Sequence, residues 1–215
     1  MLRMSPQIRS FAMGATYNTL ASNRNLKRWG LLDDDKCMLC LKPKCTLQHV
    51  LSGCKTALAD GRYRFRHDSI LKSISHFIQQ RIDKNKRETE KLDATIKVGN
   101  SKNLLLKATD WVFLVDLKRQ LVFPSHICVT RLRPDIVLFS NSSRLLIIIE
   151  LTAPCEENIA ERHMFKLDHY SALVQECIGN GWQTSFFAVE VGARGYASSS
   201  MRKCFVDLGF IGNTL

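Results

Sequence analysis

The segment from Arg133 to Thr152, RPDIVLFSNSSRLLIIIELT, carries two acidic residues at the edges of two apolar runs. Asp135 stands at the start of the first run, and Glu150 ends the second, which is almost wholly apolar. The 14 residues between them include a polar turn at 141–143, which suits two short antiparallel strands that bring both carboxylates to one end of a sheet. A buried acid without a partner is unfavourable by several kcal/mol, and a divalent cation suits it. The segment therefore predicts a Mg²⁺ site of the type that hydrolyses phosphodiesters.

The helix expected downstream carries three polar side chains at steps of four, Arg162, Lys166 and Tyr170. Residues four apart share one face of an α-helix. We expect Lys166 to reach back to the carboxylates as a third catalytic residue, and Arg162 and Tyr170 to bind flanking phosphates. The structural alternative is an ion pair between Asp135 and Arg133, with Lys166 on a solvated helix face.

Four of the eight cysteines crowd between residues 37 and 54. Cys37, Cys40, His49 and Cys54 have the spacing C-x2-C-x8-H-x4-C. Three thiolates and one imidazole make a closed tetrahedral Zn²⁺ site, which is typical of structural zinc. Cys45 stays open as a replacement ligand. A knuckle of this size binds nucleic acid more often than it binds protein.

Positive charge is concentrated in the first part of the chain. Residues 1–91 hold 18 Lys and Arg against 8 Asp and Glu, a net charge of +10, whereas residues 92–215 hold 13 against 12, a net charge of +1. Such a surface favours a polyanion through phosphate contacts and counterion release, although a solvated basic face is the plainer interpretation. The residues that we expect to hold nucleic acid are Arg62, Arg64 and Arg66, with a basic connector at Arg24, Lys27 and Arg28.

The apolar periodicity predicts an α/β protein in two parts. Residues 1–91 are expected to form a basic helical region, with a helix from Pro6 to about Leu20, the zinc knuckle at 37–54 and a long amphipathic helix over Ala59–Arg81. The charge run DKNKRETEK at 83–91 is interpreted as the exposed end of that helix plus a linker. Residues 92–215 are expected to form a mixed sheet flanked by helices. Its strands are predicted at 111–115, 120–123, 128–139, 144–151 and 182–191, and its helices from 154 to about 178 and at 199–208.

Asp135, Glu150 and Lys166 resemble the PD-(D/E)XK signature of restriction-like nucleases, with Pro134-Asp135 as its PD pair. A CCHC knuckle, a linker and this nuclease in series resemble the C-terminal region of non-LTR retrotransposon polyproteins, in the phrases CTLQHVLSGCKTAL, RPDIVLFS and IELTAPCEENI. The resemblance covers most of the chain, from about residue 10 to residue 212. It implies a restriction-endonuclease-like fold and Mg²⁺-dependent nicking of target DNA, which primes reverse transcription. Thr152 stands where the commonest motif has lysine, so the resemblance assigns the catalytic lysine to Lys166.

The resemblance also implies which molecules the protein binds and that it derives from a longer polyprotein. The partners are DNA, the RNA of the element and a reverse transcriptase in cis. Because 215 residues cannot hold a polymerase, we interpret the chain as a tail fragment, a truncated element or a relic. No apolar run approaches the ~20 residues that cross a bilayer, and no signal peptide is evident, so we expect no membrane partner and an intracellular, nuclear location.

The leading interpretation is a Mg²⁺-dependent endonuclease, in which Asp135, Glu150 and the main-chain carbonyl of Leu151 hold the metal. The first alternative is a catalytically inactive relic that contains zinc and binds DNA or RNA. The second is a protein-interaction adaptor that uses the Ala59–Arg81 helix.

Overall fold

The computed structural model describes residues 5–91 and 103–210. Four strands form one mixed sheet in the order β1-β2-β3-β4. β1, β2 and β3 are antiparallel neighbours, and β4 runs parallel to β3. The predicted α/β class and the antiparallel pairing of the two acidic segments are confirmed. The strands are β1 Val112–Val115, β2 Ile136–Ser140, β3 Leu145–Thr152 and β4 Gln183–Glu190.

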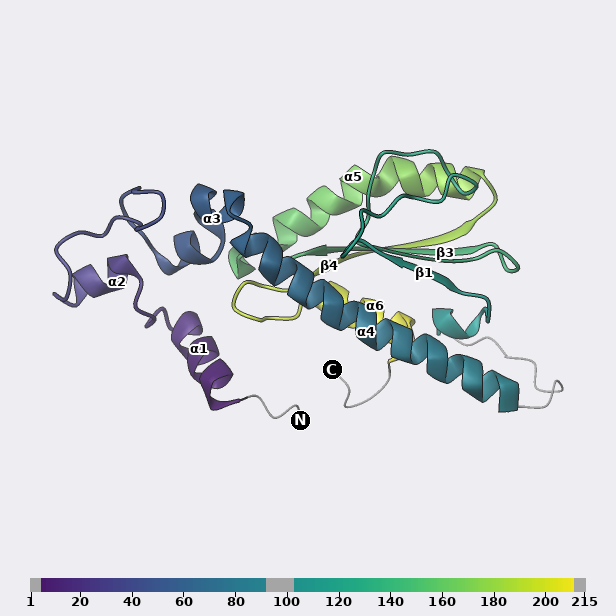
Figure 1. The fold of residues 1–215 in the computed structure, drawn as a ribbon, viewed down its shortest axis with the longest axis horizontal. Helices are drawn as coiled ribbons and strands as arrows, with labels where there is room; N and C mark the ends of the chain where they lie inside the picture. The colour runs from purple at the N-terminus through teal and green to yellow at the C-terminus, as the bar shows by residue number, and fades with distance from the viewer. Residues whose placement is uncertain (1–4, 92–102, 211–215) are drawn as a thin grey trace.

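Helices cover both faces of the sheet, with α5 (Ile159–Gly179) on one face and α4 (Arg62–Lys91) and α6 (Ser199–Asp207) on the other (Figure 1). The alternation of strand side chains divides the core accordingly. Leu146 and Ile148 of β3 pack with the α5 side, and Ile147 and Ile149 pack with the α4 and α6 side. Because both faces are covered, β3 is apolar along nearly its whole length.

The long helix differs from its prediction at both ends. Gly61, with φ of +81°, separates a short helix, α3 (Lys55–Ala59), from α4, so the long helix begins at Arg62 rather than at residue 59. It then continues through the charge run to Lys91, where a linker was expected. Lys84 pairs with Glu88 at 3.7 Å one turn away, and charged residues of this kind are good helix formers.

α4 shares its core with the sheet. Leu71, Ile74 and Ile78 are almost fully buried and pack in the same cluster as β2, β3 and α6. The predicted division near residue 91 stays a prediction, and part of the predicted linker lies outside the described residues. What the structure adds is that the hydrophobic core of the sheet includes a helix from the basic first part of the chain.

The two strands predicted at 120–123 and 128–139 need correction. Residues 120–123 were expected to form a strand, but they lie in a loop, where Leu121 and Phe123 pack into the α5 side of the core. The strand expected from Cys128 begins only at Ile136. Apolar residues that alternate with polar ones can pack into the core from a buried loop as well as from a strand. The apolar pattern at 120–123 therefore did not distinguish the two structures.

The remaining helices largely follow the predicted positions. α1 (Pro6–Thr16) ends four residues earlier than expected, and α2 (Asn23–Arg28) coincides with the basic connector. A 3-10 turn, η3 (Glu156–Asn158), precedes α5, which therefore starts at residue 159 rather than 154. α5 stops as predicted before Gly181, whose φ of +83° is left-handed. No helix within residues 5–91 and 103–210 has the length and apolarity needed to cross a bilayer.

Candidate functional site

The two predicted acids lie side by side at one end of the sheet. Asp135 immediately precedes β2, and the register that pairs Ile136 with Ile149 sets it beside Glu150. The Asp135 N–H donates to Glu150 Oε2 at 3.3 Å, and the Leu151 N–H donates to Asp135 Oδ2 at 2.7 Å. Both acids are nearly enclosed, with 8% and 5% of their surfaces exposed. The structure thus places the two carboxylates close together, as the hairpin spacing predicts.

α5 supplies two side chains to Glu150. Lys166 Nζ lies 2.5 Å from Glu150 Oε1, and the Tyr170 hydroxyl donates to Glu150 Oε2 at 3.0 Å. Tyr170 differs from its predicted role as a phosphate contact, because it is only 3% exposed and its hydroxyl is engaged by the acid. We therefore correct Tyr170 from a nucleic-acid contact to a support for Glu150. Arg133, the alternative partner of Asp135, instead lies 3.5 Å from Asp116.

His67 of α4 belongs to this site, although the sequence analysis did not select it. Its Nε2 lies 3.4 Å from Asp135 Oδ2 and 3.3 Å from the carbonyl oxygen of Leu151, and its Nδ1 lies 3.1 Å from Asp68. Burial opposes protonation, but hydrogen bonding and the charge of Asp135 outweigh it and raise the pKa of His67 to about 9. A signal was present in the sequence, because His67 stands one turn before Leu71 on the apolar stripe of α4.

The two carboxylates repel each other, although His67 and Lys166 offset their charge. Burial and the charge of Asp135 raise the pKa of Glu150, although Lys166 and the Tyr170 hydroxyl act in the opposite direction. A cation between the two carboxylates would remove this repulsion. The oxygen atoms at the site belong to the two carboxylates and to the carbonyl of Leu151, which are ligand types that Mg²⁺ prefers. His67 Nε2 lies within hydrogen-bonding distance of the Leu151 carbonyl and of Asp135 Oδ2. By ligand type alone, this set of oxygens is compatible with a magnesium ion.

A cluster of cysteine and histidine side chains forms the second part of the site. The ligand atoms of Cys37, Cys40, His49 and Cys54 all lie within 4.8 Å of one another. The Cys37 and Cys54 sulfurs are 3.9 Å apart, and Cys40 Sγ lies 3.3 Å from His49 Nε2. Cys45 is outside this group, and burial raises its pKa to about 11. These four residues form a cluster that could bind zinc.

Local structure prepares the cluster for metal. Burial by itself raises the pKa of the Cys37 thiol. Hydrogen bonds from the backbone N–H groups of residues 40 and 39 and from the His49 ring have the larger effect and lower the pKa to about 6. A low pKa favours the thiolate that binds metals. Tyr63 of α4 anchors the backbone of two of the four cluster residues. Its hydroxyl accepts from the Cys54 N–H at 3.0 Å and lies 3.1 Å from the His49 carbonyl oxygen. The cluster is thus anchored to the first turn of α4.

The predicted basic residues are not equally free. Arg62 lies 2.6 Å from Asp60, and Arg24 lies 2.6 Å from Asp35. Each of these pairs reduces the charge available to a phosphate. Arg64 has an exposed side chain on the same helix as Arg62.

Arg66 and Arg162 line the same hollow. Arg66 is partly buried, and its Nη2 donates to the carbonyls of Leu51 at 2.7 Å and Ala153 at 3.4 Å, which links the cysteine unit to the end of β3. Arg162 is exposed on α5. The hollow between them has a volume of about 370 Å³ and is also lined by Lys166. Because Lys166 bonds Glu150 as well, the hollow adjoins the acid pair.

A second buried acid was missed at the end of β4. Glu190 is 1% exposed and lies opposite Thr152 in the parallel register. His163 of α5 holds it at 2.9 Å, and the Ser200 hydroxyl donates to its other oxygen. The signal resembles that of Glu150, since an apolar strand ends in an acid. Glu190 is fully engaged by these partners and joins α5, β4 and α6.

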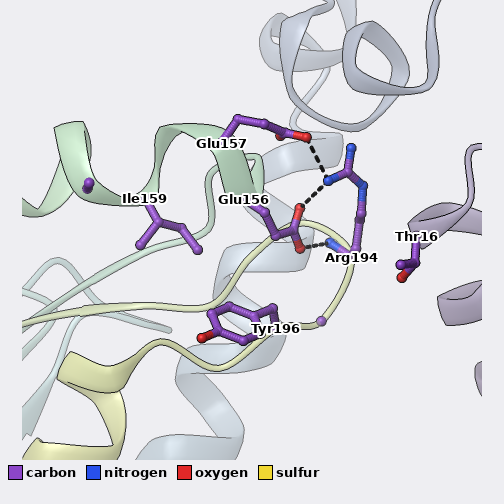
Figure 2. A pocket seen from close by; sticks show the side chains of 8 residues that line it. Thr16, Glu156, Glu157, Ile159, Arg194 and Tyr196 are labelled. Atoms are coloured by element: carbon purple, nitrogen blue, oxygen red, sulfur yellow. Dashed lines mark hydrogen bonds and ion pairs between the residues drawn. The ribbon is translucent and has the colours of Figure 1, made fainter.

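Figure 2 shows another acidic group, in which Arg194 stands between Glu156 and Glu157. The guanidinium lies 3.4 Å from Glu156 Oε2 and 2.9 Å from Glu157 Oε1, and the Arg194 N–H donates to Glu156 Oε1 at 2.7 Å. Together with Cys155 these acids could also ligate a metal. Because Arg194 pairs with both acids and its N–H also bonds Glu156, we regard the group as a structural clasp for the loop after β4.

No protein-family model matches the chain, and a search of the curated proteins finds no match either.

Proposed function

We propose that this chain is a Mg²⁺-dependent DNA endonuclease that nicks target DNA, as the C-terminal part of a non-LTR retrotransposon protein. The supporting observation is the pair of nearly enclosed carboxylates on neighbouring strands, with Lys166 bound to one of them. A protein that only binds nucleic acid gains nothing from acids that repel phosphate. The same acids are useful where a cation joins them to a phosphodiester.

Each residue of the site has a defined role in this proposal. Asp135, Glu150 and the Leu151 carbonyl would hold the magnesium ion, which would supply Lewis acidity and a more acidic water. Lys166 orients the attacking water and stabilises the negative charge that develops on the phosphate. His67 positions Asp135 through its Nε2, and the Tyr170 hydroxyl positions Glu150.

The cysteine unit and the basic residues serve binding. Zinc held by Cys37, Cys40, His49 and Cys54 is structural in this proposal, because four protein donors leave no open coordination position. Arg64 and Arg162, with the basic connector, contact phosphates. This binding is expected to be insensitive to sequence and to weaken with salt.

A Glu150→Ala variant separates binding from cleavage. We expect it to lose Mg²⁺-dependent nicking while its metal-free affinity for DNA stays equal or rises slightly, since a negative charge beside the phosphate is removed. Nicking of supercoiled plasmid and fluorescence anisotropy with duplex DNA measure the two quantities. The matched control is Glu161→Ala, an exposed acid on α5, which should retain both.

Two outcomes would contradict the proposal. If Glu150→Ala is folded and loses binding in parallel with nicking, Glu150 does not act as a metal ligand. If the zinc-loaded wild type binds DNA well but never nicks it, the chain is the catalytically inactive relic.

A further inference from the structure

We propose that the hollow between the cysteine unit and α5 binds a single unpaired nucleotide of the DNA strand that is cut. We call it the nucleotide pocket, and the residues that carry the argument are Tyr63, Arg66, Arg162, Phe165 and Lys166. Its place beside the reacting phosphate rests on the proposed endonuclease function. Its ligand chemistry rests on the pocket alone.

The size and charge of the pocket suit a small anion. Its volume of about 370 Å³ is within the range of pockets that take small organic ligands. Three of its lining side chains are cationic, Arg66, Arg162 and Lys166, and none of the described residues that line it is acidic. Lys166 is compensated by Glu150, so the net positive charge comes from the two arginines.

Arg66 supplies the strongest reason to expect a phosphate. Its Nε is buried and makes no hydrogen bond with any described residue, and its Nη2 meets only the carbonyls of Leu51 and Ala153. No carboxylate within residues 5–91 and 103–210 forms an ion pair with it. A partly buried cation without a counterion is unfavourable. A phosphate in the pocket would supply the missing negative charge.

Phe165 supplies a surface for a base. It is 54% exposed, and its ring stacks on His169 with a centroid separation of 5.8 Å and an interplanar angle of 10°. The ring is therefore supported by His169 of the same helix, and Phe165 also lines the pocket. Exposed aromatic rings beside cations form platforms on which unpaired bases stack. A base inside a duplex is already stacked between its neighbours, so the pocket favours a base that is unpaired or flipped out.

The pocket also ties the cysteine unit to the acid pair. Tyr63 lines it and hydrogen-bonds the backbone at Cys54 and His49. Lys166 also lines it and contacts Glu150. A nucleotide held here would therefore lie between the metal-binding unit and the carboxylates, with its phosphate close to Lys166.

The test compares two DNA duplexes that differ by one unpaired nucleotide. Fluorescence anisotropy with the full zinc-loaded chain, in buffer without Mg²⁺, measures the affinity for a fully paired duplex and for the same duplex with a single-nucleotide bulge. We expect about tenfold tighter binding of the bulged duplex. Phe165→Ala should abolish this preference and Phe165→Tyr should keep it. Phe11→Ala, an exposed aromatic on α1, should leave it unchanged.

Equal affinity of the wild type for both duplexes would overturn the inference. A Phe165→Ala variant whose affinities for the two duplexes fall by the same factor, so that the preference for the bulge remains, would also overturn it. Plasmid nicking in Mg²⁺ is measured in parallel. A bulge preference without nicking supports the pocket and refutes the endonuclease. Nicking without a bulge preference refutes the pocket and leaves the endonuclease standing.

Discussion

At the scale of single residues, each acid at the end of the sheet has its own basic partner. His67 approaches Asp135, Lys166 approaches Glu150, and His163 approaches Glu190. The partners come from α4 and α5, so the acids can be held in place only where both helices pack on the sheet. The proposed chemistry needs that precision, because a metal ligand displaced by about 1 Å loses much of its effect.

Asp110 gives a residue-scale prediction about pH. It accepts hydrogen bonds from the Ser140 hydroxyl and from the Ser142 hydroxyl and N–H, and these bonds lower the pKa of Asp110 to about 2. Because the folded-state pKa lies below the usual value of 3.8, the ionised carboxylate stabilises the fold above about pH 4, and this contribution disappears as the pH falls toward 2.

We expect Asp110→Asn to lower the melting temperature at pH 7, and the difference from wild type to shrink steadily between pH 4 and pH 2. Thermal denaturation followed by circular dichroism over this range measures it. Asp33→Asn, at an exposed position, is the matched control. A difference that stays constant down to pH 2 would show that Asp110 acts through something other than its charge.

At the scale of elements, the sequence predicted the boundaries of helices and strands well where an apolar run ended at a residue that terminates such elements, such as glycine. β3, β4, α6 and the C-terminal end of α5 lie close to their predicted limits, because apolar runs and the glycine at 181 mark these boundaries in the sequence. The extent of α4 was not predictable from apolar periodicity, since its last turns consist largely of charged residues, two of which, Lys84 and Glu88, form an ion pair on the helix surface. His67 and Glu190 were missed because their partners lie far away in the sequence, and only the tertiary structure joins them.

The burial of α4 leads to an element-scale prediction. Ile78 has 0% exposure in the core shared with the sheet, whereas the adjacent Phe77 is 48% exposed. Ile78→Ala should lower the free energy of unfolding by about 2–5 kcal/mol, and Phe77→Ala should change it by about 0.5 kcal/mol or less. Urea denaturation measures both. Equal effects of the two substitutions would mean that α4 does not pack on the sheet through this stripe.

At the scale of the whole molecule, the cysteine unit and the sheet are joined through α4. Tyr63 and Arg66 hold the unit at the start of the helix, and the stripe from Leu71 onward belongs to the core of the sheet. The proposed zinc would therefore order a unit that forms one wall of the nucleotide pocket. The rest of α4 has its own support and does not depend on that metal.

We expect about one zinc ion per chain by elemental analysis, held by the four cluster residues. Chelation should remove amide hydrogen-exchange protection from residues 37–59, because small metal units owe their folding to the ion. Protection of α4 from Leu71 to Ile82 should persist, since this part packs on the sheet. A protein without zinc whose residues 37–59 remain protected would contradict the structural role of the metal.

The central claim is that Asp135 and Glu150 bind a cation that cleaves DNA. The most direct measurement is the rate at which supercoiled plasmid becomes nicked in Mg²⁺, with wild type and Asp135→Ala compared at equal DNA occupancy. We predict nicking by the wild type that depends on Mg²⁺, and a rate at least about a hundredfold lower for the folded Asp135→Ala variant. Equal rates for the two proteins, or no nicking by a folded and DNA-bound wild type, would contradict the account.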